Sequence, residues 1–134
     1  MKKSILVLVL LIGIAVCSCN LFNSHHNNQI TENTPVITNV EDAYTYTVNG
    51  DAFSDSTREA LVFSSNEAVL TYTILDYSAG TIILDIDNAD TLLIYNDTIN
   101  GNAVIVEDVN EKPCFIKLVF DNFSGMFELA LAED

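Results

Sequence analysis

Residues 68–87 read AVLTYTILDYSAGTIILDID, and the alternation within this stretch decides the fold class. Apolar side chains occupy every second position of residues 68–75, with threonines between several of them. Residues 76–80 have the composition of a turn, and the alternation resumes over residues 81–87. A period of two is that of a β-strand with one buried face. The stretch therefore predicts two strands separated by a turn.

The same pattern recurs along the chain, with turn signals every 8 to 12 residues and no helical periodicity. The predicted strands cover residues 43–48, 58–64, 68–75, 81–87, 91–95, 103–108, 114–120 and 126–132. Such spacing favours an all-β fold, an antiparallel β-sandwich of about eight strands, jelly-roll or Ig-like, with a small barrel as the alternative. Cys114 alternates in phase with Ile116, Leu118 and Phe120, so we expect it to be buried as a small apolar side chain.

Four segments of the second half carry a resemblance to a known class of domain. They are GTIIL at 80–84, DTLLIY at 90–95, FIKL at 115–118 and SGMFEL at 124–129. Together they resemble small secreted jelly-roll modules, such as the pre-peptidase C-terminal domain. The resemblance implies a sandwich and assigns no function.

The N-terminus has the layout of a secretory signal. Lys2 and Lys3 precede the apolar run of residues 5–16, which is too short for a transmembrane helix of about 20 residues. Residues 14–19, IAVCSC, resemble the lipobox of bacterial lipoproteins, in which a small residue precedes the cysteine that is acylated. Ser18 precedes Cys19, whereas bulky Val16 precedes Cys17. Cys19 is therefore the first choice for lipidation and Cys17 the second.

This resemblance divides the chain into three parts. Residues 1–18 are a lipoprotein signal peptide, residues 19–40 a lipidated cysteine with a flexible polar tether, and residues 41–134 a single β-domain. It implies export and a lipid anchor in the cell membrane or outer membrane, with the domain outside the cytoplasm. The tether contains the only two histidines, His25 and His26, and adjacent histidines rarely chelate a metal well.

The charge of the chain restricts the classes of partner that it can bind. Without Lys2 and Lys3 the chain keeps three basic residues against 19 acidic ones, a formal net charge of −16. Such a surface repels phosphate backbones, which argues against nucleic-acid binding. The remaining partners are the membrane, through the anchor, and an unidentified protein or small molecule.

The domain offers little catalytic chemistry. It has no histidine for a hydrolytic triad, no phosphate-binding loop and no zinc motif, so we expect no enzyme and no cofactor. Asp85, Asp87 and Asp90 cluster at one strand end and are weak candidates for calcium, whose ligands are hard oxygens. Tyr77 and Tyr95 are weak candidates for a ligand-binding platform, in particular for carbohydrate.

Three hypotheses follow from these observations. The first is an envelope-anchored, non-enzymatic binding or interaction module, of which a calcium- or carbohydrate-binding module is one variant. The second is a structural or assembly accessory subunit of an envelope complex, docking through a sheet edge. The third is an enzyme of a type that the sequence does not reveal.

The lipobox generates a direct prediction. Mass spectrometry of the mature N-terminus should find an acylated Cys19, because Ser18 supplies the small residue that precedes it. An acylated Cys17, or a chain that begins at Met1, would contradict this assignment.

Overall fold

The computed structural model describes residues 30–134, which contain only strands, turns and loops. The strands are β1 (Val36–Val40), β2 (Ala43–Ala60), β3 (Ala68–Asp87), β4 (Leu93–Ile99), β5 (Ala103–Val109) and β6 (Phe115–Glu133). No helix in this part of the chain is long and apolar enough to cross a membrane. The predicted signal peptide, both candidate lipidation sites, and the tether as far as residue 29 lie outside the described residues.

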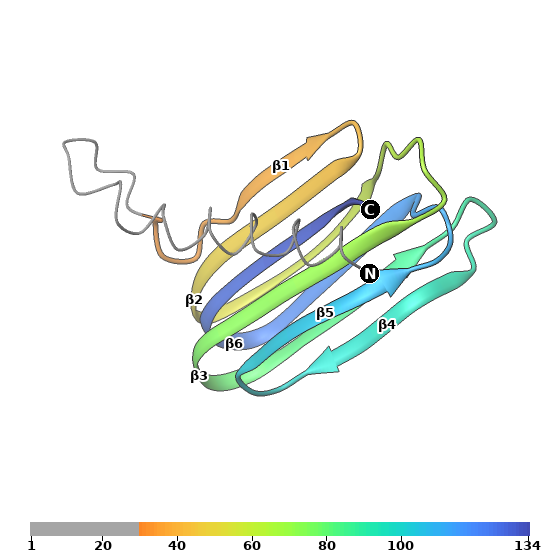
Figure 1. The fold of residues 1–134 in the computed structure, drawn as a ribbon. Helices are drawn as coiled ribbons and strands as arrows, with labels where there is room; N and C mark the ends of the chain where they lie inside the picture. Colours follow the sequence, from red (N-terminus) through yellow and green to blue (C-terminus); the bar gives the residue numbers. More distant parts are fainter. Residues whose placement is uncertain (1–29) are drawn as a thin grey trace. The chain divides into compact units, whose positions relative to one another are not determined.

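All six strands join one open antiparallel sheet in the order β1-β2-β6-β3-β4, with β5 also pairing with β3 (Figure 1). The long strand β3 pairs with β6 along one side. Along its other side it pairs first with β5, over residues 68–74, and then with β4, over residues 82–87. The predicted all-β class is confirmed.

The structure has six strands where eight were predicted. Three of the predicted turns do not end a strand, which reduces the predicted eight to five, and β1 is a sixth strand that was not predicted. Residues 49–51, 76–80 and 121–125 lie inside β2, β3 and β6, and the strands bend there and continue. Each bend coincides with a shift in pairing register, as between Gly50 and Phe53. Residues with positive φ angles occur in all three bends. They are Asp76, Gly80, Asn122 and Gly125, which are of types that favour turns, and Ala52, which is not.

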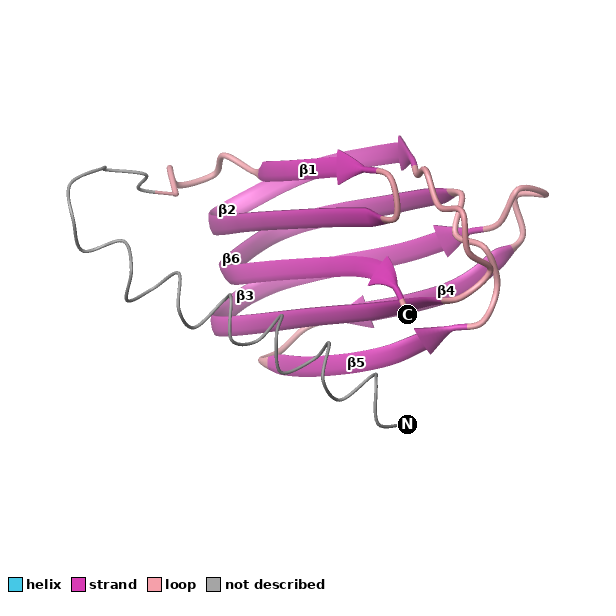
Figure 2. Cartoon of the chain, turned by 45° about the horizontal axis from the view of Figure 1, so that its top comes forward, coloured by secondary structure: helices cyan, strands magenta, loops and turns pink. Residues whose placement is uncertain are grey.

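The bends bring two halves of the same sheet to face each other (Figures 1 and 2). Tyr46 pairs with Leu129 along the ladder, and Phe120 pairs with Asp55, yet the rings of Tyr46 and Phe120 stack with centroids 5.5 Å apart. This contact joins opposite halves. The apolar residues of the predicted alternation fill the space between the halves, including the following fully buried side chains: Tyr44, Leu70, Ile74, Ile82, Leu84, Ile86, Ile116, Leu118 and Phe127.

The bend region is tightly packed. Gly80 has φ +88°, and a Cβ there would lie 2.3 Å from the carbonyl oxygen of Asn122. At the bends, side chains provide hydrogen-bond partners for backbone groups that have none in the strand pairing. Ser124 Oγ accepts a hydrogen bond from Ala52 N, and Ser54 Oγ accepts one from Asn122 N, both at 2.9 Å. The bends are therefore structured corners.

Strand β1 lies within the segment that the sequence analysis assigned to the tether, so the domain begins earlier than residue 41. Residues 36–40 pair with β2 from Val36↔Thr47 to Val40↔Ala43. Just before the strand, Asn33 N donates to Asn49 O at 2.8 Å. All five residues of β1 are exposed, so the strand has no buried face and no alternation that a sequence pattern could reveal.

The bend at Gly80 can be tested by substitution. Gly80→Ala combines a disfavoured positive φ with a clash against the backbone at Asn122, and should lower the free energy of unfolding by roughly 2–4 kcal/mol. Gly101→Ala is the matched control, because nothing lies within 4 Å of the added Cβ and its φ is not in the left-handed region. It should change stability by less than about 1 kcal/mol. Equal effects of the two substitutions in urea titrations would contradict the close approach at Gly80.

Candidate functional site

Three of the segments that connect successive strands lie at the end of the sheet away from the bends. Residues 61–67 join β2 to β3, residues 88–92 join β3 to β4, and residues 110–114 join β5 to β6. Between them lies a solvent-open cavity of about 370 Å³. It is lined by Asn66, Asn88, Ala89, Asp90, Asn110, Glu111, Lys112 and Cys114. The volume is within the range of small-molecule sites.

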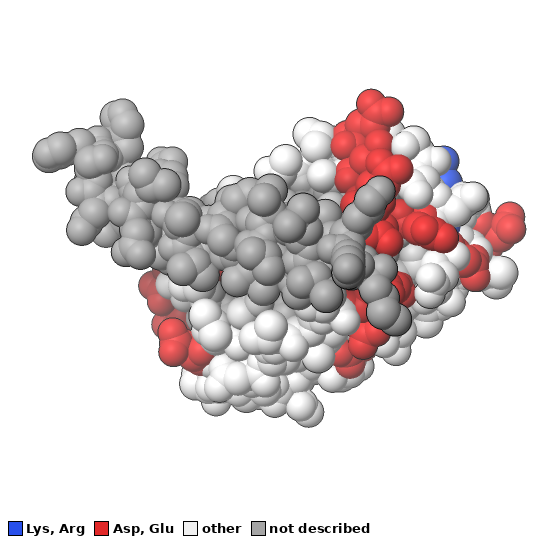
Figure 3. Space-filling model, viewed as in Figure 1, with Lys and Arg blue, Asp and Glu red and all other residues white. Residues whose placement is uncertain are grey.

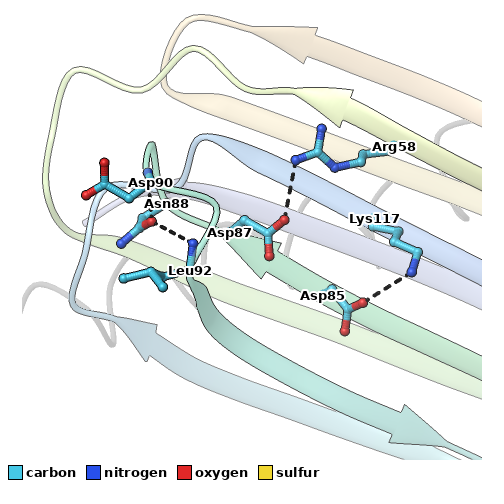
Figure 4. A network of polar contacts seen from close by, with 7 residues as sticks. All are labelled: Arg58, Asp85, Asp87, Asn88, Asp90, Leu92 and Lys117. Atoms are coloured by element: carbon cyan, nitrogen blue, oxygen red, sulfur yellow. Dashed lines mark hydrogen bonds and ion pairs between the residues drawn. The ribbon is translucent and has the colours of Figure 1, made fainter.

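Asn88 holds one wall of the cavity in place (Figure 4). Its Oδ1 accepts hydrogen bonds from the backbone N–H groups of Asp90 and Leu92, both at 3.0 Å. Its Nδ2 donates to Glu111 Oε2 at 3.0 Å, which ties this wall to the opposite one. The side chain of Asn88 is thus committed to the structure, as is typical of asparagine in tight turns. The side chains of Asp90, Asn110 and Lys112 are therefore available to contact a ligand.

Cys114 lines this cavity, and the prediction that it is buried is wrong. Strand β6 begins one residue later, at Phe115, so Cys114 lies beyond the part of the strand that the opposite half covers. The residue is partly exposed, and its thiol donates a hydrogen bond to the carbonyl oxygen of Lys112 at 3.7 Å. The backbone of Cys114 remains well held, because its N–H donates to Asp87 O at 2.9 Å and its carbonyl accepts from Leu61 N at 2.8 Å. The cavity therefore contains a positioned and accessible thiol.

The three aspartates proposed as calcium ligands have separate surroundings (Figure 4). Asp85 lies 3.6 Å from Lys117 Nζ and accepts a hydrogen bond from Asn96 Nδ2 at 2.6 Å. Asp87 lies 3.4 Å from the Arg58 guanidinium. Among residues 30–134 there is no group of three or more His, Cys, Asp or Glu side chains that could hold a metal ion. Asp90 is the one member of the trio that lines the cavity.

These ion pairs use two of the three basic side chains in residues 30–134. The Arg58 guanidinium also lies 4.0 Å from the centre of the Phe115 ring. Both pairs are partly exposed and lie on the outward face of the second half, where screening by water keeps their contribution small. Lys112 is the third basic residue, and it lines the cavity.

Neither candidate platform tyrosine lines the cavity. Tyr77 packs against the core within the bend of β3, and its hydroxyl donates to Gly80 O at 2.9 Å. Tyr95 packs against the core from β4, and burial raises the pKa of its hydroxyl. The hydroxyl of the neighbouring Tyr72 donates to the Asp97 carboxylate, and burial together with this hydrogen bond raises the pKa of Tyr72.

A second group of tyrosines lies on β2, between β1 and β6. The hydroxyls of Tyr44 and Tyr46 are buried and have no hydrogen-bond partner among the described residues. Burial raises the pKa of both, and the nearby carboxylates of Glu59 and Asp55 raise it further. Both phenols therefore stay protonated at neutral pH and cannot serve as a base or nucleophile there.

The cavity has the chemistry of a polar binding site. Amides donate and accept hydrogen bonds, carboxylates accept them, and the Lys112 ammonium donates them. Of its lining residues the sequence analysis had singled out only Asp90, as a site candidate, and Cys114, as a core residue. The missed members lie in the loop of residues 110–112 and at Asn66, and only the strand order shows that these loops meet at one end.

No protein-family model, no curated protein and no solved structure matches this chain.

Proposed function

We propose that this chain is a lipid-anchored, non-enzymatic binding module that holds a small hydroxyl-rich ligand, such as a sugar, in the cavity at the loop end. The observation that carries the proposal is the lining of that cavity by Asn66, Asp90, Asn110 and Lys112. Hydroxyl groups donate to carboxylates and accept from ammonium groups, and they do both with amides. The lining therefore matches a polyol better than it matches an apolar or a strongly charged ligand.

Export and anchoring rest on the N-terminal residues. The lipobox-like segment and the basic and apolar residues before it support cleavage before Cys19 and its acylation. We place the protein at the cell membrane or outer membrane, with the β-domain outside the cytoplasm. Residues 20–32 would then separate the lipid from the β-domain, and a flexible tether of this length would have an r.m.s. span of roughly 20 Å.

The composition supports the proposal that the protein is not an enzyme and does not bind nucleic acid. The β-domain contains no histidine, and the pKa values of Tyr44 and Tyr46 are raised, so neither kind of group offers proton transfer at neutral pH. The excess of acidic residues disfavours nucleic acid as a partner. We also propose that the two halves of the bent sheet act as the layers of a sandwich, of the kind found in secreted jelly-roll modules.

Calcium binding is a variant of the same proposal, with Asp90 as the residue of the predicted trio that lines the cavity. The assembly subunit is the second candidate, and strand β1 favours it. The outer edge of β1 has no neighbouring strand in the sheet order, and its sequence VITNV contains no charge, proline or bulge to discourage pairing. Such an edge can accept a strand from a partner.

The binding proposal is tested with the thiol of Cys114 as a reporter. In the chain carrying Cys17→Ser and Cys19→Ser, Cys114 is the sole thiol, and an aromatic disulfide reagent should label it without denaturant. Neutral monosaccharides, amino sugars, sugar acids, CaCl₂ and MgCl₂ are then screened for slower labelling and a raised melting temperature. We expect a sugar of the panel to do both.

Asn110→Ala should weaken the protection by about tenfold, the effect of one lost hydrogen bond of about 1.4 kcal/mol. Asn100→Ala is the matched control, an exposed asparagine outside the cavity lining, and should have no effect. No protection by any compound, or equal effects of the two substitutions, would contradict the proposal. Protection by CaCl₂ alone, and not by MgCl₂, would support the calcium variant.

A further inference from the structure

Polar side chains point into the bent sheet along the second part of β2. Asp55, Thr57 and Glu59 each lie directly opposite a buried apolar residue of β6 in the strand pairing, and all three are half-buried. Directly paired side chains project to the same face of a sheet, so these three project toward the core. Strand β1 pairs only with residues 43–47 of β2, so residues 53–60 form an edge of the second half. The two carboxylates therefore lie between the core and solvent.

Two buried phenols of the first half face this edge. The side chains of Tyr44 and Tyr46 are 0% exposed, and neither hydroxyl has a hydrogen-bond partner among the described residues. The Tyr46 ring stacks on Phe120, which is the residue of β6 opposite Asp55. Burial raises the pKa of both tyrosines most, and the carboxylate of Glu59 for Tyr44 and of Asp55 for Tyr46 raises it next. Both hydroxyls thus lie near the carboxylates, and a buried hydroxyl without a partner is costly enough to point to a ligand.

The two carboxylates lack a positive partner. Asp55 Oδ1 accepts a hydrogen bond from Ser56 N at 2.8 Å, and Glu59 Oε2 accepts one from Asn39 Nδ2 at 3.4 Å. Their other oxygens accept no hydrogen bond from residues 30–134. Both ion pairs of this part of the chain lie on the outward face instead. We name the group formed by Asp55, Glu59 and the two tyrosines the acidic edge.

The charge of the whole domain favours a cationic ligand here. Beyond Lys2 and Lys3 the chain has 19 acidic residues against three basic ones. In the view of Figure 3, acidic side chains appear over several parts of the surface, whereas Lys and Arg side chains are confined to a small area. The summed negative potential raises the local concentration of cations. We therefore expect a ligand of the acidic edge to be positively charged.

We propose that the acidic edge binds a short linear diamine, with one ammonium group at Asp55 and the other at Glu59. The two residues are four positions apart on one strand, which separates their Cα atoms by about 13 Å. Each ammonium donates to a carboxylate oxygen at about 2.8 Å, and the methylene chain between them spans the remaining distance along Thr57. An ammonium group has three donors, so each also donates to a tyrosine hydroxyl, which in turn donates its own proton to a carboxylate.

A single metal ion fits this arrangement less well. Calcium takes about six to eight oxygen ligands at about 2.3–2.6 Å, and two carboxylates from residues about 13 Å apart do not provide such a shell. No third His, Cys, Asp or Glu joins them to form a metal-binding group among residues 30–134. A monoamine reaches only one of the two carboxylates. The length of the ligand and its two charges are therefore the features that the acidic edge selects.

Isothermal titration calorimetry at low salt tests this site in the full chain carrying Cys17→Ser and Cys19→Ser. Putrescine and cadaverine are the diamine probes, and n-butylamine and CaCl₂ are the comparison ligands. We expect the diamines to bind with a dissociation constant of about 1 mM or lower, and n-butylamine to bind about tenfold more weakly because it carries one charge. CaCl₂ should bind more weakly than either diamine. Added NaCl should weaken diamine binding by screening the charges.

Substitutions at the two carboxylates test their roles. Asp55→Asn and Glu59→Gln each remove one of the two charges and should weaken putrescine binding about five- to tenfold. Glu128→Gln is the matched control, because it removes the same charge from a half-buried strand residue on the outward face of the first half. It should change the affinity by less than about twofold, since a distant charge is largely screened.

Tyr46→Phe tests the buried hydroxyl separately. Without ligand this variant should melt no lower than the parent, because it removes a hydroxyl that has no partner, and it should bind putrescine about threefold more weakly. A lower melting temperature without ligand would show that the hydroxyl is already partnered, which contradicts the proposal.

Two further results would overturn the proposal. They are diamines that bind no more tightly than n-butylamine, and equal effects of Glu59→Gln and Glu128→Gln. Either result would assign the inward carboxylates to protection of an edge strand against pairing with another chain. None of these measurements involves Cys114, so the failure of this proposal can be told from the failure of the sugar-binding proposal.

Discussion

The folding of β2, β6 and β3 back over themselves is the constraint on which the rest of this structure depends. Each strand continues through its bend, so the two halves of the sheet share the same three central strands. The halves can meet only if the backbones approach closely at the corner, and Gly80 against Asn122 supplies that approach. Once the corner is formed, the rings of Tyr46, Phe120 and Phe127 come within stacking distance and bury the core.

The cavity and the two outward faces of the sheet both follow from this bending. All three bends lie at one end of the sheet, and three of the connecting segments meet at the other end and surround the cavity. Since the apolar side chains of the strands fill the interior, the residues between them face outward on each half. In the second half those residues include two ion pairs, and in the first they are mostly Val, Thr and Ala. One folded sheet thus has two outward faces of different chemistry.

The sequence predicted the parts of this fold that depend on local alternation. Tyr44, Leu70, Ile82 and Ile116 are buried as the period of two requires. The same local reasoning could not distinguish a turn that ends a strand from a bend inside one, because Gly, Asn and Asp serve both by adopting positive φ. It also missed β1, whose side chains are exposed on both faces.

The residues of the candidate site were harder to predict from the sequence than the strands were. Asp90 was singled out for its charge, but Asn66, Asn110 and Lys112 are separated from it along the chain and meet it only through the strand order. Cys114 was assigned to the core because it keeps the phase of its strand. Phase predicts which side of a strand a residue occupies, and it does not predict whether the opposite half extends far enough to cover it.

The bent sheet is tested most directly by nuclear Overhauser contacts between the rings of Tyr46 and Phe120 in selectively labelled protein. In the strand pairing, Tyr46 lies opposite Leu129 and Phe120 lies opposite Asp55, so the pairing alone does not bring the two rings together. Our account predicts strong ring-to-ring contacts, because the centroids are 5.5 Å apart across the two halves. Contacts of each ring with its own ladder neighbours, and none between Tyr46 and Phe120, would contradict the folding of one sheet over itself.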